Sequence, residues 1–218
     1  MKMKFKTPRY PRKFRNILGP DLDPRYSVLR EHYKSIFDYK LGNQNLWGTE
    51  TFLGDWDGEF LLVAKDFYPT CYIEEARESG ERHPYRHNES ADTNENLRTI
   101  LQHFGRYPTD TTNTDCNFLY ISACFLLRTD GKKRGHLRHE AKALAVSAPV
   151  VAFTMHAMCR LRCVVAMGNE AQRALAKPSL AQIVDARKLK IVHVCHPSVG
   201  LDLEKWKVAF SHRRRPAS

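Results

Sequence analysis

The chain has no long apolar run. None of its hydrophobic stretches approaches the roughly 20 residues that a membrane-spanning helix requires. The first 15 residues are basic, but they lack the apolar centre of a signal peptide. We therefore expect a cytoplasmic protein that does not associate with membranes.

Cysteine is present, but not in the spacing of a metal site. The six cysteines include no CxxC pair, and Cys124, Cys163 and Cys195 fall within apolar runs that we expect to be strands. Cys159 and Cys163 are four residues apart, with no second His or Cys pair to complete a site. We predict buried, reduced thiols, no metal and no cofactor.

Two sequence motifs of common enzymes are also missing. The chain contains neither standard glycine-rich phosphate loop, and no nucleophile elbow surrounds a Ser or a Cys. Gly168, which follows an apolar run, is alone weak evidence for nucleotide binding. Together with the lack of clustered metal-binding carboxylates, these absences count against an unrelated nucleotide hydrolase.

Positive charge is abundant. The 218 residues include 35 Lys and Arg against 24 Asp and Glu, which gives a net charge of +11. Such an excess attracts polyanions, so the composition favours a nucleic acid as the partner. Hydrophobic residues make up 42% of the chain, enough for a folded domain with a real core. No obligate protein partner is evident, and we expect a monomer.

The pattern of apolar residues predicts an α/β fold. Four apolar runs are typical of buried strands, at residues 60–64, 118–124, 163–167 and 190–195. Helical spacing occurs at residues 24–39, 93–104, 140–161, from 170 onward, and at 203–210, with Pro149 expected to split the longest helix. This alternation predicts a three-layer α/β/α fold with a central, mainly parallel four-stranded sheet. We assign residues 16–218 to one domain and residues 1–15 to a basic arm.

Polar residues follow the predicted strands. Asp66 and an aromatic pair, Phe67 and Tyr68, come after the first strand, and His196 comes after the last. In an open parallel sheet, ligands bind at the carboxyl ends of the strands. A carboxylate, an imidazole, aromatic rings and a basic surface suit the extrusion of a base from DNA and the hydrolysis of its glycosidic bond.

Four segments, in the same order, resemble motifs of the uracil-DNA glycosylase superfamily. Residues 65–69, Lys-Asp-Phe-Tyr-Pro, keep the Asp and the Tyr of a first motif that reads Gly-Gln-Asp-Pro-Tyr-His in the best-known branch. Residues 196–198 match the His-Pro-Ser that begins the last motif. The strand at 119–123 and the strand and glycine turn at 164–168 are similar to the segments between them. The resemblance covers roughly residues 45–210.

The resemblance implies a monofunctional DNA glycosylase. Asp66 would stabilise the sugar cation and orient water, and His196 would stabilise the departing base. The residues expected to contact the base are Lys65, Phe67, Tyr68, Tyr85 and Ser122. Those expected to contact DNA are Lys132, Lys133, Arg134, Asn169, Ser198, Val199, Gly200 and Leu201. Leu201 is the expected wedge in the duplex, with Val199 as the alternative, and residues 128–138 are expected to form a basic loop, solvated or in contact with phosphates.

Simpler interpretations exist for the same residues. Asp66 could cap a turn, His196 could be a core histidine, and the aromatic residues could be core residues. Uracil-specific relatives carry an Asn where this chain has Ser122, which would make a larger pocket. This favours a modified pyrimidine, such as the modified cytosines of phage DNA, and a role in antiviral defence. Tyr68 argues against a bulky base, and the alternatives are a uracil-DNA glycosylase of base-excision repair or an inactive DNA-binding module.

Overall fold

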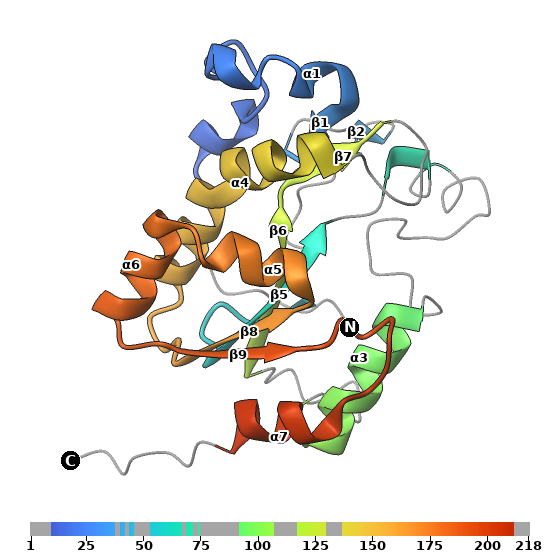
Figure 1. Cartoon of the computed structure of the whole chain (residues 1–218), viewed down its shortest axis with the longest axis vertical. Coiled ribbons are helices and arrows are strands. Elements are labelled where there is room, and N and C mark those ends of the chain that lie inside the picture. Colours follow the sequence, from blue (N-terminus) through green and yellow to red (C-terminus); the bar gives the residue numbers. More distant parts are fainter. Residues whose placement is uncertain are drawn as a thin grey trace.

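The computed structural model describes residues 10–37, 40–41, 44–45, 53–66, 69–71, 74, 92–106, 117–129 and 137–211. Its centre is a five-stranded sheet with the order β4-β6-β5-β8-β9 (Figure 1). The four parallel strands are β5 (Phe60–Asp66), β6 (Phe118–Cys124), β8 (Cys163–Met167) and β9 (Lys190–Val194). The predicted parallel sheet is confirmed, and the short β4 (Leu53–Gly54) adds an antiparallel edge next to β6.

The strands are apolar on both faces because both faces are covered. Along β5, Leu61 and Val63 belong to one hydrophobic cluster, and Leu62 and Ala64 belong to the other. Alternate residues of a strand point to opposite faces, so the continuous apolar run supplies both clusters at once. This pattern made the parallel strands recognisable in the sequence.

Helices cover the two faces of the sheet (Figure 1). One face packs against α4 (Leu137–Ala157), α5 (Asn169–Leu175) and α6 (Pro178–Ala186). The other face packs against α3 (Asp92–His103) and α7 (Leu203–Phe210). The result is the expected three-layer α/β/α arrangement. The described residues include no helix that is both long enough and apolar enough to cross a membrane.

The longest helix runs through its proline. Pro149 lies inside α4, so the predicted split into two helices is wrong. A proline inside a helix costs about 3 kcal/mol, because it removes one backbone hydrogen bond and crowds the preceding turn. Val150 and Val151, next to it, are almost completely buried in the core on this face of the sheet. Burial of this kind outweighs local propensity in most protein helices.

The segment before the sheet differs most from the prediction. In place of one helix at 24–39, the chain forms a 3₁₀ turn η2 (Pro24–Tyr26), the short helix α1 (Leu29–His32) and the strand β1 (Tyr33–Ser35). β1 pairs in antiparallel fashion with β7 (Leu126–Arg128), with Tyr33 opposite Arg128. Tyr33 and Ser35 are buried and Lys34 between them is exposed, which is the two-residue period of a strand. A second small antiparallel pair joins β2 (Lys40–Leu41) and β3 (Gln44–Asn45).

The described end of the basic arm is packed into the protein. Tyr10 hydrogen-bonds through its hydroxyl to Oγ1 of Thr154, at 2.5 Å. Its ring packs against Trp56 and Phe125, with centroids 5.2 and 5.8 Å away, and Phe14 in the 3₁₀ turn η1 (Arg12–Asn16) is also buried. Burial raises the pKa of Tyr10 well above its ordinary value, so its hydroxyl stays protonated.

The order of the parallel strands creates a switch point. The chain passes from β5 outward to β6 on one side and then returns to add β8 and β9 on the other side of β5. In open α/β sheets, ligands bind outside the carboxyl ends of the strands at such a reversal. Here the reversal lies between β5, which ends at Asp66, and β8, which is followed by Gly168.

Candidate active site at the carboxyl end of the sheet

Asp66 is the last residue of β5 and lies opposite Cys124 at the end of β6. Its Oδ2 is 3.4 Å from Nε of Arg128, the last residue of β7. Burial raises the pKa of Asp66 to about 6, although the positive charges of Arg128 and Lys65 act to lower it. The carboxylate therefore titrates just below neutral pH, a property that is common among catalytic carboxylates.

Arg128 is not the surface residue that the sequence suggested. It was expected to begin an exposed basic loop, but it lies in β7 and is only 6% exposed. The pairing of β7 with β1 explains this position, because it holds Arg128 opposite the buried Tyr33. Arg128 therefore forms an ion pair with the carboxylate of Asp66, and the expectation that it lies in a solvated loop is wrong.

Lys65 forms an ion pair with the first turn of α4. It lies on the same face of β5 as Leu61 and Val63, which is the face that α4 covers. Its Nζ is 2.5 Å from Oε1 of Glu140. Burial acts to lower the pKa of Lys65, but the bond to Glu140 and the neighbouring carboxylates outweigh it and raise the pKa. Lys65 thus remains a cation at neutral pH.

His196 follows β9 and is half-buried. Its Nδ1 accepts a hydrogen bond of 3.3 Å from the backbone N–H of Ser198 and lies 2.8 Å from the Ser198 hydroxyl. A backbone N–H can only donate, so Nδ1 is the unprotonated nitrogen and Nε2 carries the proton of the neutral ring. Burial lowers the pKa of His196, which favours this neutral form. The ring can therefore donate a hydrogen bond from Nε2.

Three elements fix the position of His196. Gly168, with a φ of +86°, approaches it so closely that a Cβ at this position would lie 3.3 Å from Cβ of His196. The N–H of Gly168 donates to the carbonyl of Val194 at the end of β9, at 3.0 Å. Asn96 of α3 donates through Nδ2 to the carbonyl of Pro197, at 2.8 Å. The histidine is therefore held by β8, β9 and α3.

Asp66 and His196 belong to one electrostatic environment. Glu170, in the first turn of α5, acts to raise the pKa of both groups. Lys65 acts to lower the pKa of both groups. Two charged residues, Glu170 and Lys65, therefore influence both of the predicted catalytic residues. Glu140 and Glu170 were not predicted as site residues, and Arg128 was expected only as part of a basic loop.

Ser122 does not reach the edge of the sheet. It is 3% exposed and lies opposite Ala64, two residues before the level of Asp66 and Cys124. A side chain enclosed within the strand cannot contact a base that is bound at the carboxyl end. The prediction that Ser122 contacts the base has no support in this geometry.

The two candidate wedge residues in the turn after His196 differ in their exposure. Val199 is 80% exposed, whereas Leu201 is half-buried against the hydrophobic cluster under α3 and α7. Ser198 is exposed and bonded to His196, and Gly200 lies between the two apolar residues with a φ of +158°. The geometry favours Val199, the alternative, as the protruding apolar residue.

The remaining predicted residues divide into two groups. Asn169, the first residue of α5, is exposed beside the switch point. The others lie outside the described residues: Phe67, Tyr68, Tyr85, Lys132, Lys133 and Arg134. Within the described part of the chain, no three His, Cys, Asp or Glu side chains are grouped as a metal ion would require.

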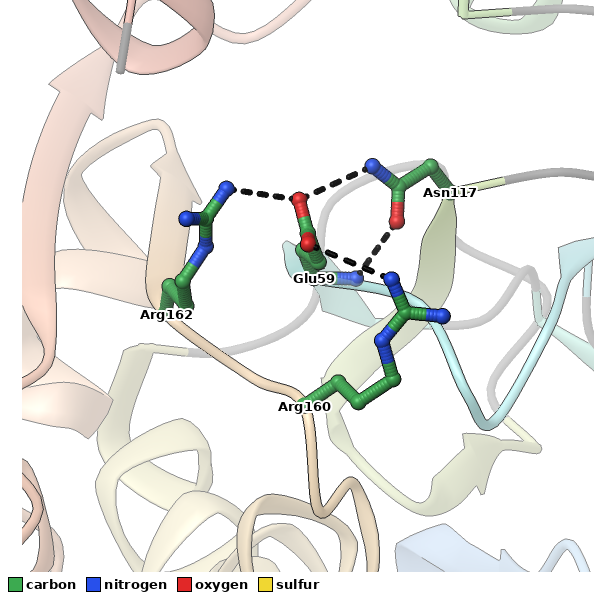
Figure 2. A network of polar contacts seen from close by, with 4 residues as sticks. All are labelled: Glu59, Asn117, Arg160 and Arg162. Atoms are coloured by element: carbon green, nitrogen blue, oxygen red, sulfur yellow. Dashed lines mark hydrogen bonds and ion pairs between the residues drawn. The ribbon is translucent and has the colours of Figure 1, made fainter. Parts of the chain in front are cut away.

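A second buried carboxylate occupies the opposite end of the sheet (Figure 2). Glu59, immediately before β5, accepts a hydrogen bond of 3.1 Å from Nδ2 of Asn117. Arg162 and Arg160 pair with its two oxygens, at 2.7 and 3.3 Å. Burial acts to raise the pKa of Glu59, but Asn117 and the two arginines outweigh it, and the pKa is lowered. This network joins the segments that begin β5, β6 and β8.

Comparisons with known proteins add no family to this description. No family model matches the chain, and no curated protein matches it. The structure by itself therefore defines an α/β/α protein with a charged site at the switch point of its sheet.

Proposed function

We propose that this protein is a DNA glycosylase, which extrudes a base from DNA and hydrolyses its N-glycosidic bond. One observation carries the proposal. A carboxylate that ionises near pH 6 and a neutral imidazole follow strands of one parallel sheet and share the same charged neighbours. Cleavage of a glycosidic bond needs a negative charge beside the sugar and a hydrogen-bond donor beside the departing base.

The proposed reaction assigns a role to each group. The bond between C1′ and the base nitrogen breaks, and its electron pair leaves with the base. Ionised Asp66 stabilises the positive charge that develops on the sugar and orients a water molecule, which adds to C1′ and releases a proton that neutralises the anion of the departing base. His196 donates from Nε2 to the base as negative charge develops there. The products are a free base and an abasic site.

The charge state of Lys65 agrees with a monofunctional glycosylase, which does not cleave the DNA strand. Strand cleavage by a bifunctional glycosylase requires a neutral amine that forms a Schiff base with the sugar. Lys65 is paired with Glu140, and its pKa is raised. It therefore remains an ammonium ion, and we expect no lyase activity from it.

DNA binding is part of the proposal. The net charge of +11 favours association with phosphates. Val199, exposed in the turn that follows His196, is positioned to occupy space in the duplex when a base leaves the stack. Because Ser122 is buried within β6, it does not indicate which base is the substrate. The substrate test therefore includes DNA with uracil and DNA with a modified pyrimidine.

A second function is favoured by one specific contact. The Asp66 carboxylate is already ion-paired with buried Arg128, as a structural carboxylate would be. A DNA-binding module without turnover is therefore the alternative.

Direct detection of released bases distinguishes the two functions. The full-length protein would be incubated with duplex and single-stranded DNAs that contain uracil, hypoxanthine, hydroxymethylcytosine or its glucosylated form. Mass spectrometry would then identify the free bases, with Asp66→Asn as the control. Release of one base by the wild type but not by the variant supports the glycosylase. DNA binding without release from any substrate would overturn it and favour the binding module.

A further inference from the structure

The contact between Arg128 and Asp66 joins two separate sheets. Arg128 ends β7, which belongs to the small antiparallel sheet with β1, whereas Asp66 ends β5 of the main sheet. Nε of Arg128 and Oδ2 of Asp66 are 3.4 Å apart, and the arginine side chain is only 7% exposed. A buried charge needs a charged or strongly polar partner. Asp66 is therefore one charged partner of this buried arginine.

Among the described residues, the two carboxylates around Asp66 balance the two cations, and Asp66 itself adds a further negative charge. In the described part of the chain, the groups that interact with it are Lys65 from β5, Arg128 from β7, Glu140 from α4, Glu170 from α5, Cys124 from β6 and Tyr33 from β1. Burial raises the pKa of Cys124 to about 12, and burial also raises the pKa of Tyr33, so both stay neutral. Three carboxyl groups then face two cations. Lys65 is bonded to Glu140, which leaves Arg128 as the cation in contact with Asp66.

The approach of DNA makes this imbalance more severe. Phosphates bring further negative charge, and negative charge near a carboxylate favours its protonated form. A protonated Asp66 could not stabilise a sugar cation. A fixed cation beside it offsets this effect, and arginine suits the task because it remains charged even when it is buried.

We propose that Arg128 is a positioning residue that acts through its positive charge and keeps the Asp66 carboxylate ionised while DNA is bound. This inference rests on the proposed function for its purpose. The interaction itself can be tested without any catalytic activity. Arg128 acts through Asp66 and does not itself contact the substrate.

The titration of Asp66 provides the direct test. Carboxyl carbons of aspartate would be labelled with ¹³C in the full-length protein, and the Asp66 signal would be assigned by its loss in Asp66→Asn. In Arg128→Gln, the midpoint of the Asp66 titration should rise by about 1–3 pH units, because an opposite charge at this distance has an effect of that size. Arg128→Lys keeps the positive charge and should restore much of the wild-type midpoint.

A matched variant at the other end of the sheet serves as the control. Arg162→Gln also removes an arginine from a buried carboxylate, that of Glu59, and should leave the Asp66 midpoint unchanged. An unchanged Asp66 midpoint in folded Arg128→Gln would overturn the inference. If Arg128→Gln does not fold, Arg128→Met takes its place, because methionine also removes the positive charge. An unchanged Asp66 midpoint in folded Arg128→Met would contradict the inference.

The pH profile of base release separates this inference from the proposed function. In Arg128→Gln, the acidic limb of kcat should move to higher pH by the same interval as the NMR midpoint, and Arg128→Lys should restore it. If the wild type releases no base, the glycosylase proposal fails. The NMR titration still decides whether Arg128 controls the charge of Asp66. A shifted NMR midpoint with an unshifted pH profile would show that Asp66 is not the group that governs turnover.

Discussion

Two buried carboxylates lie at opposite ends of β5, and their environments push their pKa values in opposite directions. The side chain of Glu59 is 11% exposed and that of Asp66 is 20% exposed. Glu59 receives a hydrogen bond from Asn117 and pairs with two arginines, and its pKa is lowered. Asp66 contacts Arg128 across 3.4 Å, among other carboxylates, and its pKa is raised to about 6.

The difference between the two ends fits the proposed function, in which the amino end is a structural site and the carboxyl end is the active site. At the amino end, enough donors surround the carboxylate to compensate for its burial, which is how a buried charge contributes to a stable fold. At the carboxyl end, the compensation is incomplete, and the protein keeps a carboxylate that is costly to ionise. Groups of this kind are concentrated at functional sites.

Replacement of each carboxylate by its amide should give the largest contrast. We expect Asp66→Asn to lower base release by orders of magnitude, because it removes the charge that stabilises the sugar cation. DNA binding should be unchanged or tighter, since a negative charge near phosphates is lost. Glu59→Gln is the matched control and should retain activity per folded molecule. Single-turnover base release and DNA affinity are the measurements, and equal losses in both variants would contradict the distinction between the two ends.

Loss of His196 should have the next largest effect. His196→Ala removes one hydrogen-bond donor from the departing base and should slow release by about 10²–10³-fold, the usual effect of losing one such donor. The substitution should leave the melting temperature close to that of the wild type, since the hydrogen bonds of the ring to described residues are those with neighbouring Ser198. Unchanged single-turnover rates would show that the imidazole is not the donor.

The two carboxylates should also make opposite contributions to stability as the pH changes. The pKa of Asp66 rises from 3.8 in the unfolded chain to about 6 in the fold. The stabilising contribution of Asp66 to the free energy of unfolding is therefore fully present below pH 3.8. It is lost as the pH rises through about 6. The shift of about two pH units corresponds to at most about 3 kcal/mol. Between pH 4 and 8, the free energy of unfolding of the wild type should fall by up to this amount relative to Asp66→Asn, as measured by urea unfolding.

Glu59 should show the reverse dependence. Because its pKa is lowered in the fold, its contribution is present above the unfolded value of 4.5 and is lost as the pH falls through the folded value. Glu59→Gln should therefore cost about 1–3 kcal/mol at pH 7, the usual penalty for a hydrogen-bonded buried group that loses its partner. The difference in the free energy of unfolding between Glu59→Gln and the wild type should become smaller as the pH falls. If Glu59→Gln is as stable as the wild type at pH 7, Arg160 and Arg162 must form their hydrogen bonds with water in the variant.

The sequence predicted the parallel strands well because each is a continuous apolar run. β6 and β8 have the predicted bounds, and β5 extends two residues beyond its prediction, to Asp66. The helix predicted at 24–39 was wrong because β1 is only three residues long and is stabilised by pairing with a distant strand. Short strands of this kind carry too few residues for a periodic signal.

The same reasoning explains which site residues could be predicted. Asp66 and His196 follow strands, so their positions at the edge of the sheet could be inferred from the chain alone. Arg128 and Glu140 reach the site through tertiary packing of β7 and α4, and no local pattern marks them. Ser122 was placed at the edge because the register of β6 against β5 could not be read from the sequence, and the pairing of Ser122 with Ala64 puts it inside the sheet.

The smallest expected effect distinguishes two apolar residues within the carboxyl end itself. Val199 is 80% exposed in the turn after His196, whereas Leu201 packs against the core. Val199→Ala removes two methyl groups from the predicted contact with DNA, and at about 0.8 kcal/mol for each buried carbon it should slow release from duplex about tenfold. Release from single-stranded DNA should change less, because less unstacking is needed there. Leu201→Ala should instead lower the melting temperature and affect both substrates equally. A selective loss on duplex in Leu201→Ala, with Val199→Ala unaffected, would assign the wedge to Leu201 and would require the turn to rearrange when DNA binds.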